Sequence, residues 1–178
     1  MPGAVCVTLR GDTVTAAVWR ALFRLPAVRR YFGRRFFASI PHSRRIGLTV
    51  TDVGRRSFSA AVEYREELVG NPYRGYLHGG VLTTLIDQTS GAAAFFSLSP
   101  PEFVATLDLR IDHLRAARPG RAIHARAECY HLTRHVAFVR CSAHDGDPGD
   151  PVATSISAFM RNGSVPLRFG VRRAPGAS

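Results

Sequence analysis

The chain has 178 residues, of which 46% are hydrophobic, so it is long enough and apolar enough to bury the core of one ordinary domain rather than remain disordered. Its formal charge of +11 comes from arginine alone and predicts an anionic rather than a cationic partner. No apolar run reaches the roughly 18 residues that span a bilayer, and the charged residues near the start argue against a secretory signal.

Residues 13–37 are rich in arginine and aromatic residues, with apolar residues at helical spacing on both sides of Pro26. Because proline interrupts a helix, we expect two short basic amphipathic helices within an N-terminal extension, residues 1–39. We expect their apolar faces to dock on the parent domain. Contact with a membrane surface or a partner, and an organelle transit peptide, are the alternatives.

Residues 46–64 alternate apolar and polar side chains around a turn at 52–56, which predicts two paired strands. Residues 66–76 contain glycine, asparagine and proline and are expected to form an irregular loop. This loop delivers the chain to the next element, and loops in such positions often carry functional residues.

The stretch 77–96 opens with His78-Gly79-Gly80 and continues without proline, with apolar residues at helical spacing. This pattern predicts a buried helix with a glycine entrance. Asp87 has Gly91 rather than a basic residue at its i+4 position, so we expect another group to approach it closely. The residues expected on the same side as Asp87 are small or polar: Gly80, Thr83, Thr84, Ser90, Gly91 and Ala94.

Four further strands are predicted after this helix, at residues 105–114, 121–130, 136–143 and 152–160. The order of strands, one long helix and more strands predicts an α+β fold in which an antiparallel sheet wraps around a central helix. We expect this domain to cover residues 40–163. Residues 164–178 are expected to form a loosely ordered tail.

Several residues occur in the order of a known family and, apart from Asn71, at its spacing: Asn71, His78-Gly79-Gly80, Asp87 and Thr106-Leu107-Asp108. On these residues the chain resembles, from about 40 to 162, the acyl-CoA thioesterases of the hotdog superfamily, in the branch of the phenylacetate-pathway (PaaI-like) enzymes. The resemblance implies a hotdog fold, an acyl-CoA substrate and a site assembled across a dimer. The sequence departs from the family in one place, because the family's asparagine lies six residues before the histidine, where this chain has Pro72.

Hydrolysis of a thioester requires a group that directs water at the carbonyl and a donor that stabilises the oxyanion. Asp87 is the candidate for the first role, and the backbone N–H groups near Gly79 and Gly80 are candidates for the second. On one helix the acid and the glycines lie about 12 Å apart. We therefore expect a homodimer, or a dimer of dimers, in which one subunit supplies the glycine and the other the acid.

The other candidate residues each have a simpler reading. His78 is expected to orient the loop, with a general base or a metal ligand as the alternative. Thr106 either orients the attacking water, as the resemblance implies, or serves only as a strand former. Further candidates for substrate binding are Thr84 and Ser90 on the helix and Arg115, Arg118 and Arg134 in predicted turns, where the arginines would contact phosphates of coenzyme A or merely be solvated.

Several common sites are missing from the sequence. It has no G-x-S-x-G elbow, P-loop or dinucleotide fingerprint, and His131 and His135 lie in predicted strands and turns where they form no zinc motif. The three cysteines Cys6, Cys129 and Cys141 form no CxxC pair, so we expect a reducing cytoplasm and thiols that the chemistry does not need. No metal or separate cofactor is expected, because coenzyme A would be part of the substrate.

The leading hypothesis is an acyl-CoA thioesterase that releases the free acid and coenzyme A. The alternative is a non-catalytic acyl-CoA sensor whose basic N-terminus binds DNA or a partner. Nucleic-acid binding is not expected, because fewer than forty residues precede the strands and Pro26 leaves little room for a helix-turn-helix. A structural subunit of a larger acyl-processing complex is a third hypothesis. The acyl group itself is left open.

Overall fold

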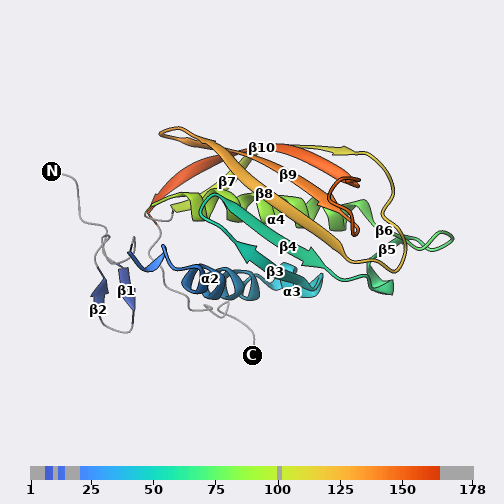
Figure 1. The fold of residues 1–178 in the computed structure, drawn as a ribbon, viewed down its shortest axis with the longest axis horizontal. Helices are drawn as coiled ribbons and strands as arrows, with labels where there is room; N and C mark the ends of the chain where they lie inside the picture. The colour runs from blue at the N-terminus through green and yellow to red at the C-terminus, as the bar shows by residue number, and fades with distance from the viewer. Residues whose placement is uncertain (1–6, 10–11, 15–20, 100–101, 165–178) are drawn as a thin grey trace, which may run out of the picture.

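The computed structural model describes residues 7–9, 12–14, 21–99 and 102–164, and its main body is one antiparallel sheet packed on one long helix (Figure 1). The sheet has six strands in the order β3-β4-β8-β9-β10-β7. They are β3 (Leu48–Val53), β4 (Ser57–Val62), β7 (Glu102–His113), β8 (Ile123–Leu132), β9 (Val136–His144) and β10 (Ala153–Ser164). The predicted α+β hotdog architecture is confirmed, and each of the six predicted strands is present.

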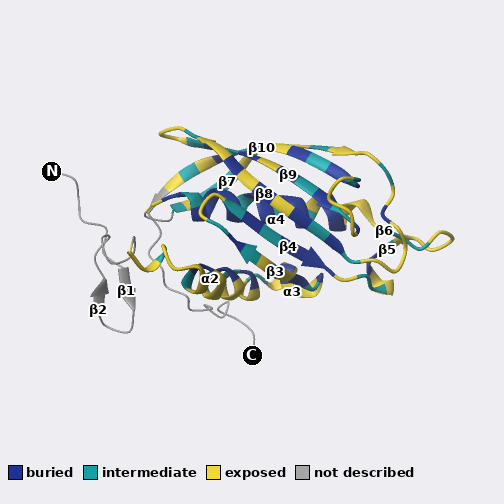
Figure 2. Cartoon of the chain, viewed as in Figure 1, coloured by how far each residue is buried: buried dark blue, intermediate teal, exposed yellow. Residues whose placement is uncertain are grey.

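The central helix α4 (Gly79–Ser97) lies across the inner face of the sheet and contacts β4, β7, β8, β9 and β10. Strand residues alternate between this face and solvent; on β8, Ile123, Ala125 and Ala127 are buried and the residues between them are more exposed (Figure 2). The alternation arises because successive side chains of a strand point to opposite faces. Leu85 and Ile86 of α4 are fully buried at the centre of the resulting core.

The helix begins at Gly79, the predicted glycine entrance, because Leu77 belongs to a short strand and His78 occupies the N-cap position. One detail of the predicted helix is wrong. Ser90 and Ala94, expected on the open side with Asp87, are both fully buried. The sheet therefore covers more of the helix circumference than the helical projection alone suggests, and Gly79, Gly80 and Asp87 lie in the strip that stays accessible.

The helix α2 (Pro26–Ser39), followed by the short helix α3 (Pro41–Arg45), packs on this body with its aromatic face. Phe36 stacks on Phe95 of α4 with ring centroids 5.6 Å apart, and Phe37 lies 5.2 Å from Phe58 of β4. The predicted docking of this second basic helix on the parent domain is confirmed. Pro26 begins the helix, as its fixed φ angle and missing N–H allow in the first turn.

The predicted start of the first basic helix, at residue 13, is wrong. Thr13 and Val14 lie in strand β2 (Asp12–Val14), which pairs with β1 (Val7–Leu9). Both residues are β-branched and favour extended backbone over helix. Residues 15–20 of the predicted helix lie outside the described part of the chain.

The predicted loop at 66–76 is more ordered than expected. It contains a 3-10 turn, η1 (Glu66–Leu68), and a small antiparallel ladder of β5 (Val69–Asn71) and β6 (Tyr76–Leu77). Gly75 in the connecting turn has φ 67°, a conformation that glycine adopts without strain, and the Tyr64 hydroxyl donates to its carbonyl at 3.1 Å. These contacts fix the segment that leads to the start of α4.

Within the described residues, no helix is long and apolar enough to cross a membrane. Cys129 and Cys141 are free thiols buried beneath the sheet. Cys6, the C-terminal tail from residue 165 onward and the other residues of the N-terminal extension before 21, apart from β1 and β2, lie outside the described part of the chain.

Candidate active site

The N-terminus of α4 is capped by the residue that precedes it. The Gly80 N–H donates to His78 Nδ1 at 2.9 Å, and the Val81 N–H donates to the His78 carbonyl at 2.9 Å. The His78 N–H in turn donates to the Leu68 carbonyl at 2.8 Å, which anchors the cap to η1. His78 therefore holds the shape of the helix entrance, and its Nδ1 is occupied as an acceptor.

The two glycines after His78 are not equivalent. A Cβ atom at Gly80 would lie 2.9 Å from His78 Nδ1. The His78 ring therefore leaves no room for a larger residue at position 80. Apart from its chain neighbours and the helix's own backbone, a Cβ atom at Gly79 would have no atom of a described residue within 4 Å, and no described residue accepts a hydrogen bond from its N–H. Of the two predicted donors, Gly79 is the one open to a ligand at the positive end of the helix dipole.

Gly70 is a third glycine at this entrance, and the sequence analysis missed it. A Cβ atom there would lie 2.7 Å from His78 Cα and 2.9 Å from His78 Cβ. Gly70 thus permits β5 to pass directly against the capping histidine. The β5–β6 ladder brings Gly70 against His78, and no pattern of residues in the loop predicts this ladder.

Asp87 lies two turns along α4 from the entrance and is half-buried. The Thr106 hydroxyl of β7 donates to its Oδ1 at 3.0 Å. A bulge at Leu107 sets this contact, because the β7–β10 register shifts between Ala158 and Phe159 and places Thr106 on the side that faces α4. The structure thus brings together the predicted acid and the predicted threonine, within one subunit.

The predicted separation of acid and donor follows from the observed helix. Gly79 and Asp87 are both within α4, so eight residues of rise place them about 12 Å apart along the axis. A thioester carbonyl held at the Gly79 N–H is therefore out of reach of a water held by Asp87 of the same subunit.

An open pocket of about 470 Å³ adjoins the helix entrance. Its walls combine apolar side chains with a few polar groups, and His42 of α3 lies 3.4 Å from Thr84 Oγ1 across it. Thr84 Oγ1 donates to the Gly80 carbonyl at 2.9 Å, so its hydroxyl remains an acceptor toward the pocket. The lining residues are His42, Ile46, Glu67, Leu68, Val69, His78, Gly80, Val81 and Thr84.

Asn71 occupies a turn rather than the centre of the site. Its Oδ1 accepts hydrogen bonds from the N–H groups of Tyr73 and Arg74 at 3.1 and 3.2 Å. The side-chain oxygen is thus committed to the turn between β5 and β6. Ser90 is also removed from the open strip, since it is fully buried against the sheet.

Arg115 and Arg118 both contact acidic side chains of their own subunit, and their binding of phosphate stays a prediction. Arg115 donates to both carboxylate oxygens of the buried Asp145, at 2.9 and 2.7 Å, and contacts Asp150. The Arg118 backbone N–H donates to Asp145 at 2.8 Å, and its guanidinium contacts Asp150 at 3.2 Å. These contacts hold the pKa of Asp145 well below its usual range, chiefly through the hydrogen bond from Arg115.

Arg134 is exposed and contacts no carboxylate within the described chain. It lies in the turn between β8 and β9, and this turn is tied by Arg161 to Glu102 at the first residue of β7. Arg115 instead follows the last residue of β7. The three predicted arginines therefore do not form one phosphate site on a subunit.

No group of three or more histidine, cysteine, aspartate or glutamate residues is arranged to hold a metal ion in the described segments. The thiol of Cys141 is buried on the inner face of the sheet, and burial raises its pKa to about 12. A thiol with such a pKa is protonated at neutral pH and is a poor nucleophile.

Comparison with known proteins identifies the relatives of the chain. A family model described as the thioesterase superfamily matches residues 74–152. The 1,4-dihydroxy-2-naphthoyl-CoA hydrolase of Listeria monocytogenes is 32% identical over 87 residues, which cover 49% of this chain and 68% of the relative. The medium/long-chain acyl-CoA thioesterase YigI of Salmonella typhimurium is 27% identical over 128 residues, covering 65% and 82%. The chain spans about half the length, 54% and 50%, of two other curated relatives.

Solved structures also resemble this chain. A crystal structure of a Pseudomonas aeruginosa protein is 39% identical, with a TM-score of 0.68 over 74% of this chain and 98% of that one. The Escherichia coli PaaI protein, from the phenylacetic acid degradation operon, also has a TM-score of 0.68, over 78% of this chain and 97% of that one. At 15% identity, this second likeness concerns the fold alone.

Proposed function

The chain belongs to the thioesterase superfamily, and from this premise we propose that it is an acyl-CoA thioesterase whose sites are shared between two subunits. The Gly79 N–H of one subunit would polarise the thioester carbonyl, and Asp87 of the other would direct water at it. One observation carries the proposal. The open Gly79 donor and Asp87, which Thr106 holds, lie on the same helix, but they are too far apart to act on one carbonyl within a subunit.

The chemistry assigns one task to each group. Asp87 accepts a proton from water as the oxygen attacks the thioester carbon, and the Gly79 N–H stabilises the negative charge that develops on the carbonyl oxygen. Collapse of the tetrahedral intermediate expels the thiolate of coenzyme A, which takes up the proton. Thr106 positions Asp87, because its hydroxyl donates to the carboxylate at 3.0 Å.

The edge strand β7 supports pairing of subunits. It ends the sheet on one side, whereas α2 packs against β3 at the other end. A long uncovered edge exposes unpaired N–H and C=O groups, and proteins usually cover or pair such an edge. Leu107 and Phe103 of β7 are 55% and 49% exposed, so apolar side chains accompany this free edge.

The pocket beside the helix entrance supports binding of the acyl group. Its volume of about 470 Å³ lies in the range of small-molecule sites, and Ile46, Leu68 and Val81 give it apolar walls. We propose that it receives the part of the acyl group next to the carbonyl. Two relatives act, by their names, on naphthoyl-CoA and on medium- or long-chain acyl-CoA, so both aromatic and aliphatic groups are candidates.

A thiol-release assay across aromatic and short-, medium- and long-chain acyl-CoA thioesters tests this function. We expect release of coenzyme A, with at least one class of thioester turned over far faster than the spontaneous rate. Tight binding of acyl-CoA without release of thiol would instead identify the chain as an acyl-CoA sensor.

A further inference from the structure

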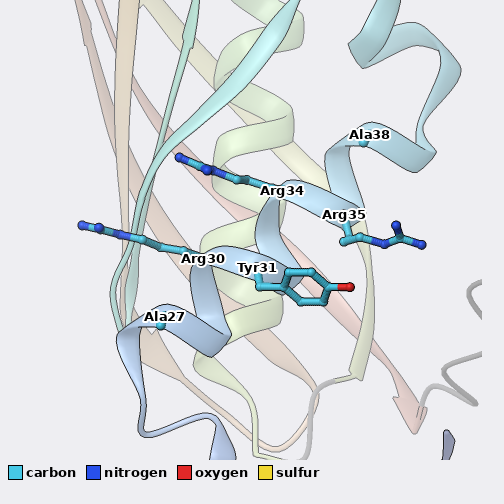
Figure 3. Close-up of a pocket in the computed structure, with 6 residues that line it drawn as sticks. All are labelled: Ala27, Arg30, Tyr31, Arg34, Arg35 and Ala38. Carbon is cyan, nitrogen blue, oxygen red and sulfur yellow. The ribbon is translucent and has the colours of Figure 1, made fainter.

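The outer face of α2 carries a cluster of basic side chains that the proposed hydrolysis does not use. Arg30, Tyr31, Arg34 and Arg35 line a shallow pocket there, and all four are exposed (Figure 3). Arg30 and Arg34 extend to one side of the helix, and Tyr31 and Arg35 extend to the other. The opposite face of α2 is packed into the core, so this arginine cluster is held on the surface of a fixed helix.

The charge around the cluster is mostly positive. Between Thr13 and Thr51 the sequence has eight arginines and no acidic residue, so this stretch carries eight of the eleven net positive charges. Arg29 is buried and donates to the Val53 carbonyl at 3.1 Å, and the exposed Arg30 contacts Asp52 at 3.1 Å. Arg34 and Arg35 contact no carboxylate among the described residues. The surface therefore presents positive charge that the fold leaves unneutralised.

Exposed apolar side chains accompany these arginines. Leu25, immediately before α2, is 54% exposed, Leu22 is 36% exposed and Tyr31 is 60% exposed. Leucine, tyrosine and arginine together match a lipid surface, where apolar side chains enter the headgroup region and arginines contact phosphates. A nucleic-acid backbone would match the arginines but gives no reason for exposed leucines beside them.

We propose that the outer face of α2 binds the surface of a bilayer that contains anionic phospholipids. The helix would lie flat on the bilayer, with Arg34 and Arg35 at the phosphates and Leu25 at the headgroup boundary. Binding would be peripheral and reversible, because few apolar side chains enter the lipid and the attraction of the arginines is screened by salt. This surface is separate from the proposed active site.

Vesicle sedimentation with the full chain tests the proposal. The probes are vesicles of phosphatidylcholine alone and vesicles of an equimolar mixture of phosphatidylcholine and phosphatidylglycerol. We expect binding to the mixture only, and we expect added salt to weaken it. The variant R34Q/R35Q should bind the mixture about 10- to 30-fold more weakly, since each arginine at such a surface is worth about fivefold. Leu25→Ser should also weaken binding, although it leaves the charge unchanged.

The control is R121Q/R126Q, which removes the same charge from two exposed positions outside the arginine cluster, one just before β8 and one within it. Its vesicle binding should stay within about threefold of the parent protein. Equal losses in both double variants would show attraction by net charge alone and would overturn the proposal, as would tighter binding to duplex DNA than to the mixed vesicles. Vesicle binding is measured without turnover, so its result does not depend on whether the chain hydrolyses acyl-CoA. R34Q/R35Q should also hydrolyse a short-chain acyl-CoA at the same rate as the parent protein.

Discussion

At the scale of single residues, Asp87 carries the charge on which the proposed chemistry depends. Replacement by asparagine keeps the size of the side chain and an acceptor for Thr106 but removes the base. We expect kcat to fall by about 10²–10⁴-fold, with KM and Tm near those of the parent protein. Steady-state kinetics and thermal unfolding give these values.

Asp52→Asn is the matched control, because Asp52 is an acid on β3 whose side chain forms an ion pair, among the described residues, only with the exposed Arg30. It should leave kcat unchanged. A structural role for Asp87 predicts the reverse pattern, in which Asp87→Asn lowers Tm and the folded protein still turns over substrate.

Gly79 and Gly80 should respond differently to the same substitution. Alanine at Gly79 meets no side chain of a described residue, so Tm should hold while kcat/KM falls by about tenfold or more, because the methyl group fills the space in front of the donor. Alanine at Gly80 meets the His78 ring at 2.9 Å, so it should disturb the cap and lower Tm by a few degrees. Thermal unfolding and initial rates on the two variants measure both effects. A large Tm loss for Gly79→Ala would contradict its assignment as the open donor.

The sequence located these residues but did not distinguish their roles. Asp87, His78 and the glycines could be predicted because their order and spacing along one stretch of the sequence form a recognisable pattern. The difference between Gly79 and Gly80 depends on the direction of the His78 ring, which spacing does not determine. The pairing of Arg115 with Asp145 and Asp150 could not be predicted, because both acids follow thirty or more residues later and meet it only once β7, β9 and β10 pair.

At the scale of elements, the contact of Arg115 with Asp145 joins the end of β7 to the end of β9. We expect Asp145→Asn to lower Tm by roughly 5–10 °C near neutral pH, because it breaks a paired charge at a buried position. The folded pKa of Asp145 is depressed, so its contribution to stability is fully present above the unfolded pKa of about 3.9. That contribution is lost as the pH falls toward the folded pKa.

The Tm difference between parent and Asp145→Asn proteins should therefore be constant from about pH 5 to 8 and shrink below about pH 4. Thermal unfolding across this range measures it. Arg140→Gln is the control, since it removes an exposed ion pair with Glu128 and should change Tm little at any pH. A Tm difference that grew on acidification would contradict the assigned pairing.

The strands and the long helix were predictable because period-2 and period-3.6 patterns follow directly from which faces are buried. The short elements were not. The β5–β6 ladder has only five residues, too few to show a repeating pattern, and hydrogen bonds that involve Leu68 and Tyr64 stabilise this segment. β1 precedes the stretch that fits a helical projection, and β2 overlaps only its first two residues, Thr13 and Val14.

At the scale of the whole molecule, the sheet leaves one strip of α4 uncovered, and the open donor and the acid both lie in it. The same strip is bounded by the free edge of β7, with its exposed Leu107. Two copies that pair along this edge with antiparallel helices would bring Gly79 of each copy to Asp87 of the other. The oligomer is thus a requirement of the proposed chemistry, because one subunit holds the two groups about 12 Å apart.

Hybrid dimers test this arrangement without assuming the details of the interface. Asp87→Asn subunits keep Gly79, and Gly79→Ala subunits keep Asp87, so a mixed dimer contains one complete shared site and one that lacks both groups. Random pairing makes half of the dimers mixed, and we expect the mixture to regain about a quarter of the parent activity, although each variant alone retains about a tenth of that activity or less. The measurement is turnover after the two proteins are unfolded together and refolded, with exchange of subunits verified by mass spectrometry. A site contained within one subunit would regain nothing, since every copy in the mixture lacks either the donor space or the base.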